Sequence, residues 1–169
     1  MNHFNLVSQR GQGWLNRAAI AANMIRKHVS EGSVIADLGC GDMKLRDALG
    51  DFRCEYRGYD LNPQSQEVAQ LDMTTADLPE CDVSVLLGVL EYIPVPAVLQ
   101  KIRSSKLVVS HVYADEGAFT PKLINQKGWI NCLPLPEFEG QLRLAGFSIV
   151  EREMTGERMQ HVWLCQGRA

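Results

Sequence analysis

One stretch of the sequence, residues 34–47, constrains the fold more than any other. It reads VIADLGCGDMKLRD, in which an apolar run leads to Asp37 and glycines follow at positions 39 and 41. From Leu45 onward, apolar residues recur at helical spacing, so the order predicts a strand, a glycine turn and a helix. Glycine lets the backbone adopt unusual dihedral angles and lets a ligand come close to it. An ordinary strand-to-helix turn is the alternative, because short glycine patterns also arise by chance.

The length and composition are those of one globular domain. The chain has 169 residues, of which 46% are hydrophobic, and such a chain can bury a substantial core. We therefore expect a single domain over residues 1–169, with an N-terminal leader and helix over residues 1–32 and the core over residues 33–166.

The cysteines and the apolar runs indicate the compartment. The five cysteines lie far apart and include no CxxC pair, which indicates reduced thiols rather than a disulfide framework or a metal site. No apolar run approaches the roughly 18 residues that a membrane span needs, and no secretory signal is recognisable. We expect a cytoplasmic protein that uses no metal and contacts no membrane.

The first 30 residues are basic, although the whole chain has a formal net charge of −3. They contain no acidic residue, and their cations are Arg10, Arg17, Arg26 and Lys27. We interpret these cations as the solvated face of an amphipathic helix over residues 14–29, with contact to an anionic acceptor as the alternative. The apolar side of this helix is expected to contain Leu15, Ala18, Ala22, Ile25 and Val29.

A second acidic residue follows a predicted strand in CEYRGYDLNP, residues 54–63. The tyrosines suit a strand, and the Asn-Pro pair ends it just after Asp60. An acid about 20 residues beyond a glycine turn can accept hydrogen bonds from the two hydroxyls of a ribose, and Asp60 lies 19 residues after Gly41. A turn or helix cap is the alternative role for Asp60.

The third strand candidate, Val68 to Leu71, follows Asp60 too closely for a normal crossover helix, so we expect that helix to be very short or missing. Asp72 and Met73 come directly afterwards. They can offer a carboxylate to an amino group and an apolar surface to a planar ring. A capping role is an equal alternative for Asp72.

The nearly continuous apolar run over residues 82–93 predicts a strand near the middle of a parallel sheet. Gly88 permits close approach of a ligand, Pro94 and Pro96 open a helix that includes Ile102, and residues 106–114 form the next strand.

The last part of the chain predicts an antiparallel ending. Residues 115–135 lack periodicity and predict a long loop or lid. A helix near Pro136 to Leu144 precedes FSIVEREM and RMQHVWLC, two strand-like runs joined by a short turn that predicts a hairpin. The expected fold class is α/β, a Rossmann-like three-layer sandwich whose mostly parallel sheet ends in an antiparallel hairpin.

Taken in order, these segments resemble the class I S-adenosylmethionine-dependent methyltransferases over about residues 33–166. The matching motifs are DLGCGD (37–42), YDLNP (59–63), LDM (71–73), LLGVLEYI (86–93) and the final hairpin. A seventh, antiparallel strand distinguishes that family from the nicotinamide dehydrogenases. The resemblance implies S-adenosyl-L-methionine as the cofactor and methyl transfer to a small-molecule acceptor, such as a hydroxyl of a sugar or another metabolite.

The resemblance also implies roles for individual residues. Asp37 would face the ammonium of the methionine part, Asp60 would hold the ribose, and Asp72 and Met73 would contact the adenine. The cofactor-binding set that it implies is Asp37, Gly39, Cys40, Gly41, Asp60, Leu61, Asp72, Met73, Leu87, Gly88 and Val89.

A hydroxyl acceptor also needs a general base, and His111 is the candidate because it lies near the carboxyl end of a predicted strand. A structural, hydrogen-bonded histidine is the alternative. Candidates for the acceptor pocket, each with packing as the alternative role, are Trp14, Arg17, Glu91, Tyr92, Tyr113 and Trp129.

Two other functions stay open. The chain could be a non-catalytic S-adenosylmethionine-binding or scaffold module, because a fold does not guarantee an activity. A nicotinamide-dependent oxidoreductase is disfavoured because Lys44 occupies a position where the GxGxxG fingerprint requires glycine or alanine. Nucleic acid is not an expected partner, since no (D/N)PP(Y/F) tetrapeptide and no net basic charge are present.

Overall fold

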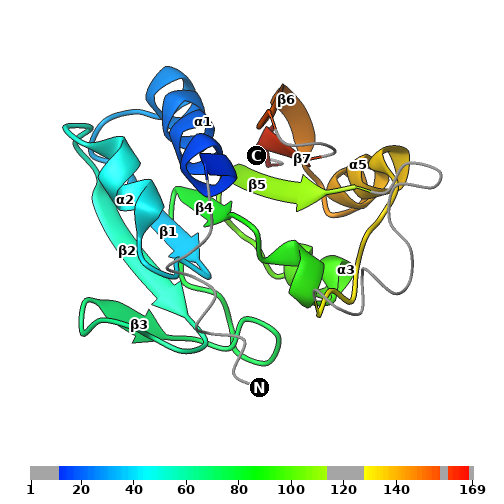
Figure 1. Ribbon diagram of the computed structural model, residues 1–169, viewed down its shortest axis with the longest axis horizontal. Coiled ribbons are helices and arrows are strands. Elements are labelled where there is room, and N and C mark those ends of the chain that lie inside the picture. The colour runs from blue at the N-terminus through cyan, green and yellow to red at the C-terminus, as the bar shows by residue number, and fades with distance from the viewer. Residues whose placement is uncertain (1–11, 114–127, 157–159, 168–169) are drawn as a thin grey trace.

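The strands form one mostly parallel sheet that ends in an antiparallel hairpin, as expected from the sequence (Figure 1). The computed structural model describes residues 12–113, 128–156 and 160–167, with side chains from Asn16 onward. Within these residues the sheet has seven strands in the order β3-β2-β1-β4-β5-β7-β6. They are β1 (Val34–Leu38), β2 (Glu55–Asp60), β3 (Val68–Gln70), β4 (Val83–Leu86), β5 (Lys106–Val112), β6 (Ser148–Met154) and β7 (Gln160–Gln166). The first five pair in parallel and the last two add antiparallel, which confirms the predicted hairpin.

Helices cover both faces of the sheet, which confirms the three-layer sandwich (Figure 1). On one face lie α1 (Gln12–His28) and α2 (Lys44–Leu49). On the other lie α3 (Val95–Leu99), α5 (Leu135–Leu144) and the short 3-10 helix η2 (Leu90–Tyr92). Each face therefore has its own apolar core.

Successive side chains of the central strands point to opposite faces of the sheet, so each strand contributes to both cores. In β1, Ile35 packs toward α1 and α2, whereas Ala36 and Leu38 pack toward α3 and α5. β4 does the same with Val85 and Leu86. Because both faces are buried, these strands read as continuous apolar runs rather than as alternating ones.

The basic residues of α1 make specific contacts with other elements. The Arg26 guanidinium donates to the carbonyls of Ala48 and Leu49, both at 2.8 Å, and so satisfies the end of α2. Lys27 and His28 both reach Glu151 of β6, at 2.9 and 2.6 Å. These contacts hold α1 across the sheet between α2 and β6.

Arg17 departs from the predicted solvated helix face, because only 4% of it is exposed. The buried stripe of α1 is wider than the sequence analysis assumed and also includes Ile20, Ala21 and Met24. Arg17 lies three and four residues before Ile20 and Ala21, so it shares their face of the helix. The interpretation of Arg17 as a solvated cation is therefore wrong.

The central strand is shorter than predicted. β4 is the fourth strand of seven, as expected, but it ends at Leu86. Gly88 then adopts a φ of 70°, and η2 begins at Leu90. Leu90 is fully buried, so the apolar run continues past the strand, and hydrophobicity alone could not show where the strand ends.

The connection from Asp60 to β3 contains turns and no helix over residues 61–67, as predicted from its length. α3 ends at Leu99, so Ile102 lies beyond the helix although it is buried. Of the predicted loop over residues 115–135, residues 115–127 lie outside the described residues, and residues 128–134 form turns and irregular structure.

The structure also shows whether the described residues contain a membrane-spanning helix, a disulfide or a cluster of possible metal ligands. Within the described ranges, no helix combines the length and apolarity needed to cross a bilayer. All five cysteines are free thiols. The described part of the chain contains no group of three or more His, Cys, Asp or Glu side chains that could hold a metal ion.

Candidate functional site

The glycine turn after β1 is hydrogen-bonded to the end of β2. The amides of Gly39 and Cys40 both donate to the Tyr59 carbonyl, at 2.7 and 3.0 Å, and the Gly41 amide donates to Asp60 Oδ2 at 3.0 Å. Asp60 Oδ1 accepts from the Asn62 amide at 2.9 Å. A carboxylate offers about four acceptor sites, so Asp60 is held in place and retains acceptor capacity for a ligand.

The turns after β1 and β4 are in contact with each other. Gly39 has a φ of 82°, and a Cβ added there would lie 2.5 Å from Val89 Cγ2. A Cβ on Gly88 would lie 2.6 to 2.7 Å from the guanidinium of Arg17. Both positions therefore need glycine, and the guanidinium of Arg17 lies directly against the backbone of Gly88.

A small open hollow lies beside these turns. Its lining contains two cations and two acids, and the acid Asp42 forms an ion pair with Lys44. The lining residues are Arg17, Ala18, Asp37, Gly39, Cys40, Asp42, Lys44, Leu45 and Leu87. The structure thus brings together four residues of the predicted cofactor set: Asp37, Gly39, Cys40 and Leu87.

Asp42 and Lys44 were not among the predicted cofactor-binding residues, and Arg17 was predicted only as a candidate for the acceptor pocket. A signal for Arg17 was present, because a cation at helical spacing from Ile20 and Ala21 falls on the buried face of α1. For Asp42 and Lys44, the signal was their position in and directly after the glycine turn.

Asp37 is the most perturbed acid of the hollow. Asp37 lies two residues after Ile35 in β1, so both side chains point to the α1 face of the sheet. Only 3% of Asp37 is exposed. Burial raises the pKa of its carboxyl to about 7. The Tyr56 hydroxyl, which donates to Asp37 Oδ2 at 2.6 Å, and the charge of Arg17 oppose this shift, whereas the charge of Asp60 adds to it. Near neutral pH the carboxyl is therefore partly protonated.

Cys40 is a thiol at neutral pH. Burial raises its pKa to about 12, and the neighbouring carboxylates of Asp37 and Asp60 add to the shift. A thiol in this state is neither a nucleophile nor a metal ligand. Its part in the site is to pack against the glycine turn and Gly58.

The predicted adenine side lies next to the end of β2, because the Leu71 amide donates to the Asp60 carbonyl at 2.9 Å. Asp72 Oδ1 accepts from the amide and the hydroxyl of Thr74, at 2.9 and 2.6 Å, and these bonds lower the pKa of Asp72. Asp72 therefore caps its own turn. Met73 is buried, whereas Leu61 is 52% exposed at the strand end.

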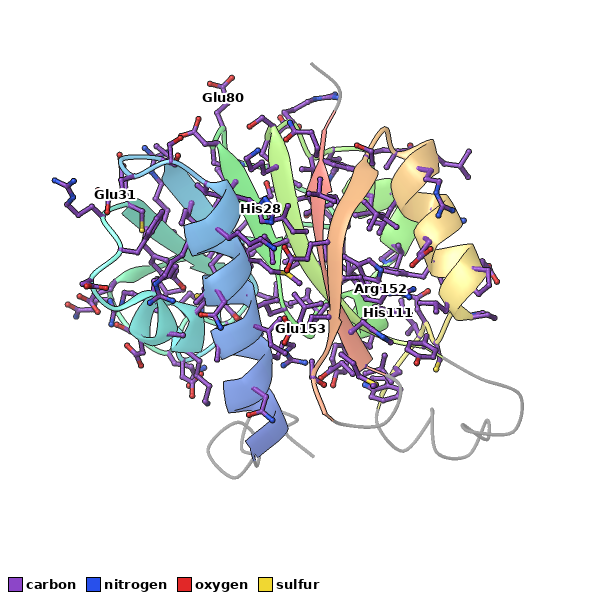
Figure 2. All side chains as sticks on the ribbon, turned by 90° about the horizontal axis from the view of Figure 1, so that it is seen from above. His28, Glu31, Glu80, His111, Arg152 and Glu153 are labelled. Carbon is purple, nitrogen blue, oxygen red and sulfur yellow. The ribbon has the colours of Figure 1, made fainter. Side chains whose placement is uncertain are left out.

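His111 lies on the opposite face of the sheet from the hollow, toward α5 (Figure 2). It is fully buried and stacks on Phe138 with ring centroids 4.3 Å apart. Neither ring nitrogen has a hydrogen-bond partner among the described residues, and Nδ1 is 3.9 Å from Glu91 Oε1. Burial lowers the pKa of His111 to about 4. The imidazole is therefore neutral at physiological pH.

Glu91 organises the wall beyond β4. It is buried, and its Oε1 accepts from the Val112 amide of β5 at 3.0 Å. Its backbone carbonyl accepts from the amides of Ile130 and Asn131, at 2.8 and 3.1 Å. Burial raises the pKa of its carboxyl, and the charge of Arg17 opposes that shift. Glu91 thus joins three segments of the chain at the carboxyl edge of the sheet.

The aromatic candidates for the acceptor pocket are spread along the same edge. Tyr92 is exposed, and Tyr113 lies against the ring of His161 with centroids 5.1 Å apart. Trp129, in the described segment that begins at residue 128, is partly buried. The side chain of Trp14 lies outside the described residues.

Comparisons with known proteins identify the fold. No family model and no curated protein matches the sequence. Magnesium protoporphyrin IX methyltransferase from Synechocystis, solved with bound S-adenosylhomocysteine, superposes with a TM-score of 0.72 at 17% identity, covering 92% of this chain and 84% of that one. The 1,6-didemethyltoxoflavin-N1-methyltransferase from Burkholderia thailandensis superposes with a TM-score of 0.67 at 15% identity, covering 90% of this chain and 79% of that one.

Human N-acetylserotonin methyltransferase, solved with S-adenosylmethionine, gives a TM-score of 0.67 at 17% identity. The match covers 91% of this chain but 52% of the human enzyme, so this chain spans about half of that enzyme's length. Together with the strand order and the glycine turn, these likenesses show that the chain has the fold of the class I S-adenosylmethionine-dependent methyltransferases.

We predict that Gly39→Ala destabilises the protein by about 1–3 kcal/mol, because the new Cβ would meet Val89 and the positive φ would be strained. Urea unfolding measures the change. Gly140→Ala is the matched control, since a Cβ there meets nothing within 4 Å inside α5, and alanine should stabilise that helix by about 0.5–1 kcal/mol. Equal stability of Gly39→Ala and wild type would contradict the tight contact.

Asp37→Asn should change how stability depends on pH. The pKa of Asp37 is about 7 in the folded protein and about 3.9 in an unfolded chain, so the folded state holds an extra proton between these values. Wild-type stability therefore falls as pH rises from about 4 to about 7, and the asparagine variant lacks that loss. Between pH 5 and pH 8, we expect the variant to gain about 2–3 kcal/mol relative to wild type in urea unfolding. A constant difference at both pH values would contradict the raised pKa.

Proposed function

We propose that this chain is an S-adenosylmethionine-dependent methyltransferase that acts on a small-molecule acceptor. A hydroxyl of a sugar or another metabolite is the first class of acceptor to test. The observation that carries the proposal is the charged hollow at the carboxyl ends of β1 and β4, with Asp60 held beside its glycine turn. The core that would bind the cofactor is residues 33–166, together with Arg17 of α1.

The donor set fits the amino-acid end of S-adenosylmethionine, which carries one carboxylate and one ammonium. Arg17 and Lys44 provide positive charge for the carboxylate, and Asp37 and Asp42 provide negative charge for the ammonium. Asp60 retains acceptor capacity for the ribose hydroxyls. The glycine turn lets the ligand approach the backbone, since a Cβ on Gly41 would meet nothing within 4 Å and the space above it is open.

The other predicted contacts complete the proposed site. Asp72 would accept from the adenine amino group and Met73 would offer its thioether to the ring, while Leu61 would lie over the same end of β2. Leu87, Gly88 and Val89 would form the wall after β4, where the Gly88 amide is fixed by Ser110 Oγ at 2.8 Å.

Methyl transfer depends mainly on the alignment of the methyl donor with the acceptor. When bound, S-adenosylmethionine supplies a methyl group already activated by a positively charged sulfur. The part of this chain is to hold donor and acceptor in line and to exclude water, because proximity and orientation provide most of the acceleration in such a reaction. Two proteins of known structure with this fold are named for small molecules, N-acetylserotonin and 1,6-didemethyltoxoflavin, which supports a small-molecule acceptor here.

His111 is the proposed base for a hydroxyl acceptor. Its neutral imidazole can accept a proton, although a pKa of about 4 makes it a weak base. Because it lies on the α5 face, the acceptor has to approach over the carboxyl end of β5 for its proton to reach the ring.

Calorimetry with S-adenosylhomocysteine tests the proposed cofactor. We expect wild type to bind in the micromolar range and Asp60→Asn to bind at least about 30-fold more weakly, or about 2 kcal/mol, because it loses charged hydrogen bonds to the ribose. Glu80→Gln is the control, since Glu80 is exposed at the opposite edge of the sheet (Figure 2). Absence of heat with folded wild type would refute the proposal, and binding of NADH instead would favour an oxidoreductase.

His111→Asn should lower kcat about 10²–10⁴-fold with a hydroxyl acceptor and leave the affinity for S-adenosylhomocysteine unchanged, because a base acts only on the acceptor's proton. The wild-type rate should fall as pH drops through about 4, where His111 becomes protonated. A screen of hydroxylated, amino and thiol acceptors identifies the substrate for this measurement, and His161→Asn is the control. A wild-type kcat in His111→Asn would exclude His111 as the base, and binding without any turnover would favour the non-catalytic module.

A further inference from the structure

Lys101 makes three hydrogen bonds to one loop. Its ammonium donates to the backbone carbonyls of Met73, Thr74 and Ala76, at 3.1, 3.1 and 2.7 Å. Lys101 lies two residues beyond the end of α3, on the segment that follows the central strand and η2. The loop that it holds, residues 71–76, carries the proposed adenine contacts Asp72 and Met73.

Two charged side chains, those of Asp72 and Lys101, make hydrogen bonds to the backbone of this loop. On the amide side, the Thr74 N–H bonds the Asp72 carboxylate, and the amides of Thr75 and Ala76 bond the Asp72 carbonyl at 3.2 and 2.9 Å. On the carbonyl side, three oxygens converge on the ammonium of Lys101. A lysine ammonium is compact and has three donors, so it suits three converging carbonyls.

The loop needs these hydrogen bonds because the segments next to it in the chain give it few contacts. Residues 61–67 contain turns, whereas the connections from β1 to β2 and from β4 to β5 contain helices, and β3 is an edge strand of only three residues. On the β2 side, the Leu71 amide bonds the Asp60 carbonyl at 2.9 Å. Beyond Leu71, Lys101 and the burial of Met73 in the α3 core fix where the loop lies.

We propose that Lys101 is a positioning residue for the adenine end of the ligand site. By holding three carbonyls of the loop, it sets the place of Asp72 and Met73 and thereby the preference of the site for an adenine base. This inference rests on the proposed function, because it concerns the same cofactor. It adds a role in base specificity for a residue that lies outside the loop itself.

Loss of the ammonium has a defined consequence. In Lys101→Met the stem is kept, but the three carbonyls lose their donor, and the partly buried Met73 carbonyl is left without its charged partner. The loop then relaxes away from α3, and the Asp72 carboxylate moves with it. Ribose and amino-acid contacts, which come from α1, α2 and the ends of β1 and β2, stay in place.

The experiment compares two ligands in calorimetry: S-adenosylhomocysteine, and S-inosylhomocysteine, in which oxygen replaces the adenine amino group. Wild type should prefer the adenine ligand. Lys101→Met should bind S-adenosylhomocysteine about tenfold more weakly, or about 1.4 kcal/mol, and S-inosylhomocysteine nearly as well as wild type does, so that the preference narrows. The control is Lys106→Met, which removes an ammonium bonded to Gln166 Oε1 at 2.8 Å on β5.

The outcomes separate the two proposals. If wild type binds neither ligand, the proposed cofactor fails. If wild type binds and folded Lys101→Met keeps the wild-type preference, the role of Lys101 is refuted, and an equal narrowing in Lys106→Met also refutes it. Circular dichroism and urea unfolding establish that the variants are folded. If Lys101→Met does not fold, Lys101→Gln, which keeps two donors, replaces it with the same expected direction and the same refuting result.

Discussion

The site depends on hydrogen bonds between the glycine turn and the end of β2. Two successive amides of the turn share the Tyr59 carbonyl, and a third donates to the Asp60 carboxylate. This arrangement requires a positive φ at Gly39, where a side chain would also collide with Val89. The ends of β1, β2 and β4 are thereby interlocked, so a change in one of these turns displaces the ligand-facing groups of the others.

Buried charge is concentrated at this edge of the sheet. The Arg17 guanidinium lowers the pKa values of both Asp37 and Glu91, while burial raises both. Buried ionisable groups reduce stability unless they are well paired, and their concentration at one edge is typical of a functional site. Near the amino ends of the strands, by contrast, the buried polar pair is neutral, with Ser104 bonded to Ser84 at 2.9 Å.

Sequence reasoning predicted the sheet, its antiparallel end and the place of Asp60, because strand periodicity and the spacing from a glycine turn are local signals. It overestimated the central strand, since Leu90 is buried beyond the strand and extends the apolar run. It also misjudged Arg17, because a cation in an amphipathic helix normally faces solvent. The predicted set of cofactor-binding residues contains four that line the hollow together. It lacked Asp42 and Lys44, and Arg17 was predicted only for the acceptor pocket.

The sequence by itself determined the order of strands and helices, the glycine turn and the acids that end β2 and follow β3, because each depends on residues close together in the chain. Only the tertiary structure decided that Arg17 lies against Gly88, that His111 faces α5 rather than the hollow, and that Lys101 holds the loop after β3. These contacts join distant segments. They depend on which face of each helix docks on the sheet, and side-chain packing across the whole domain settles that choice.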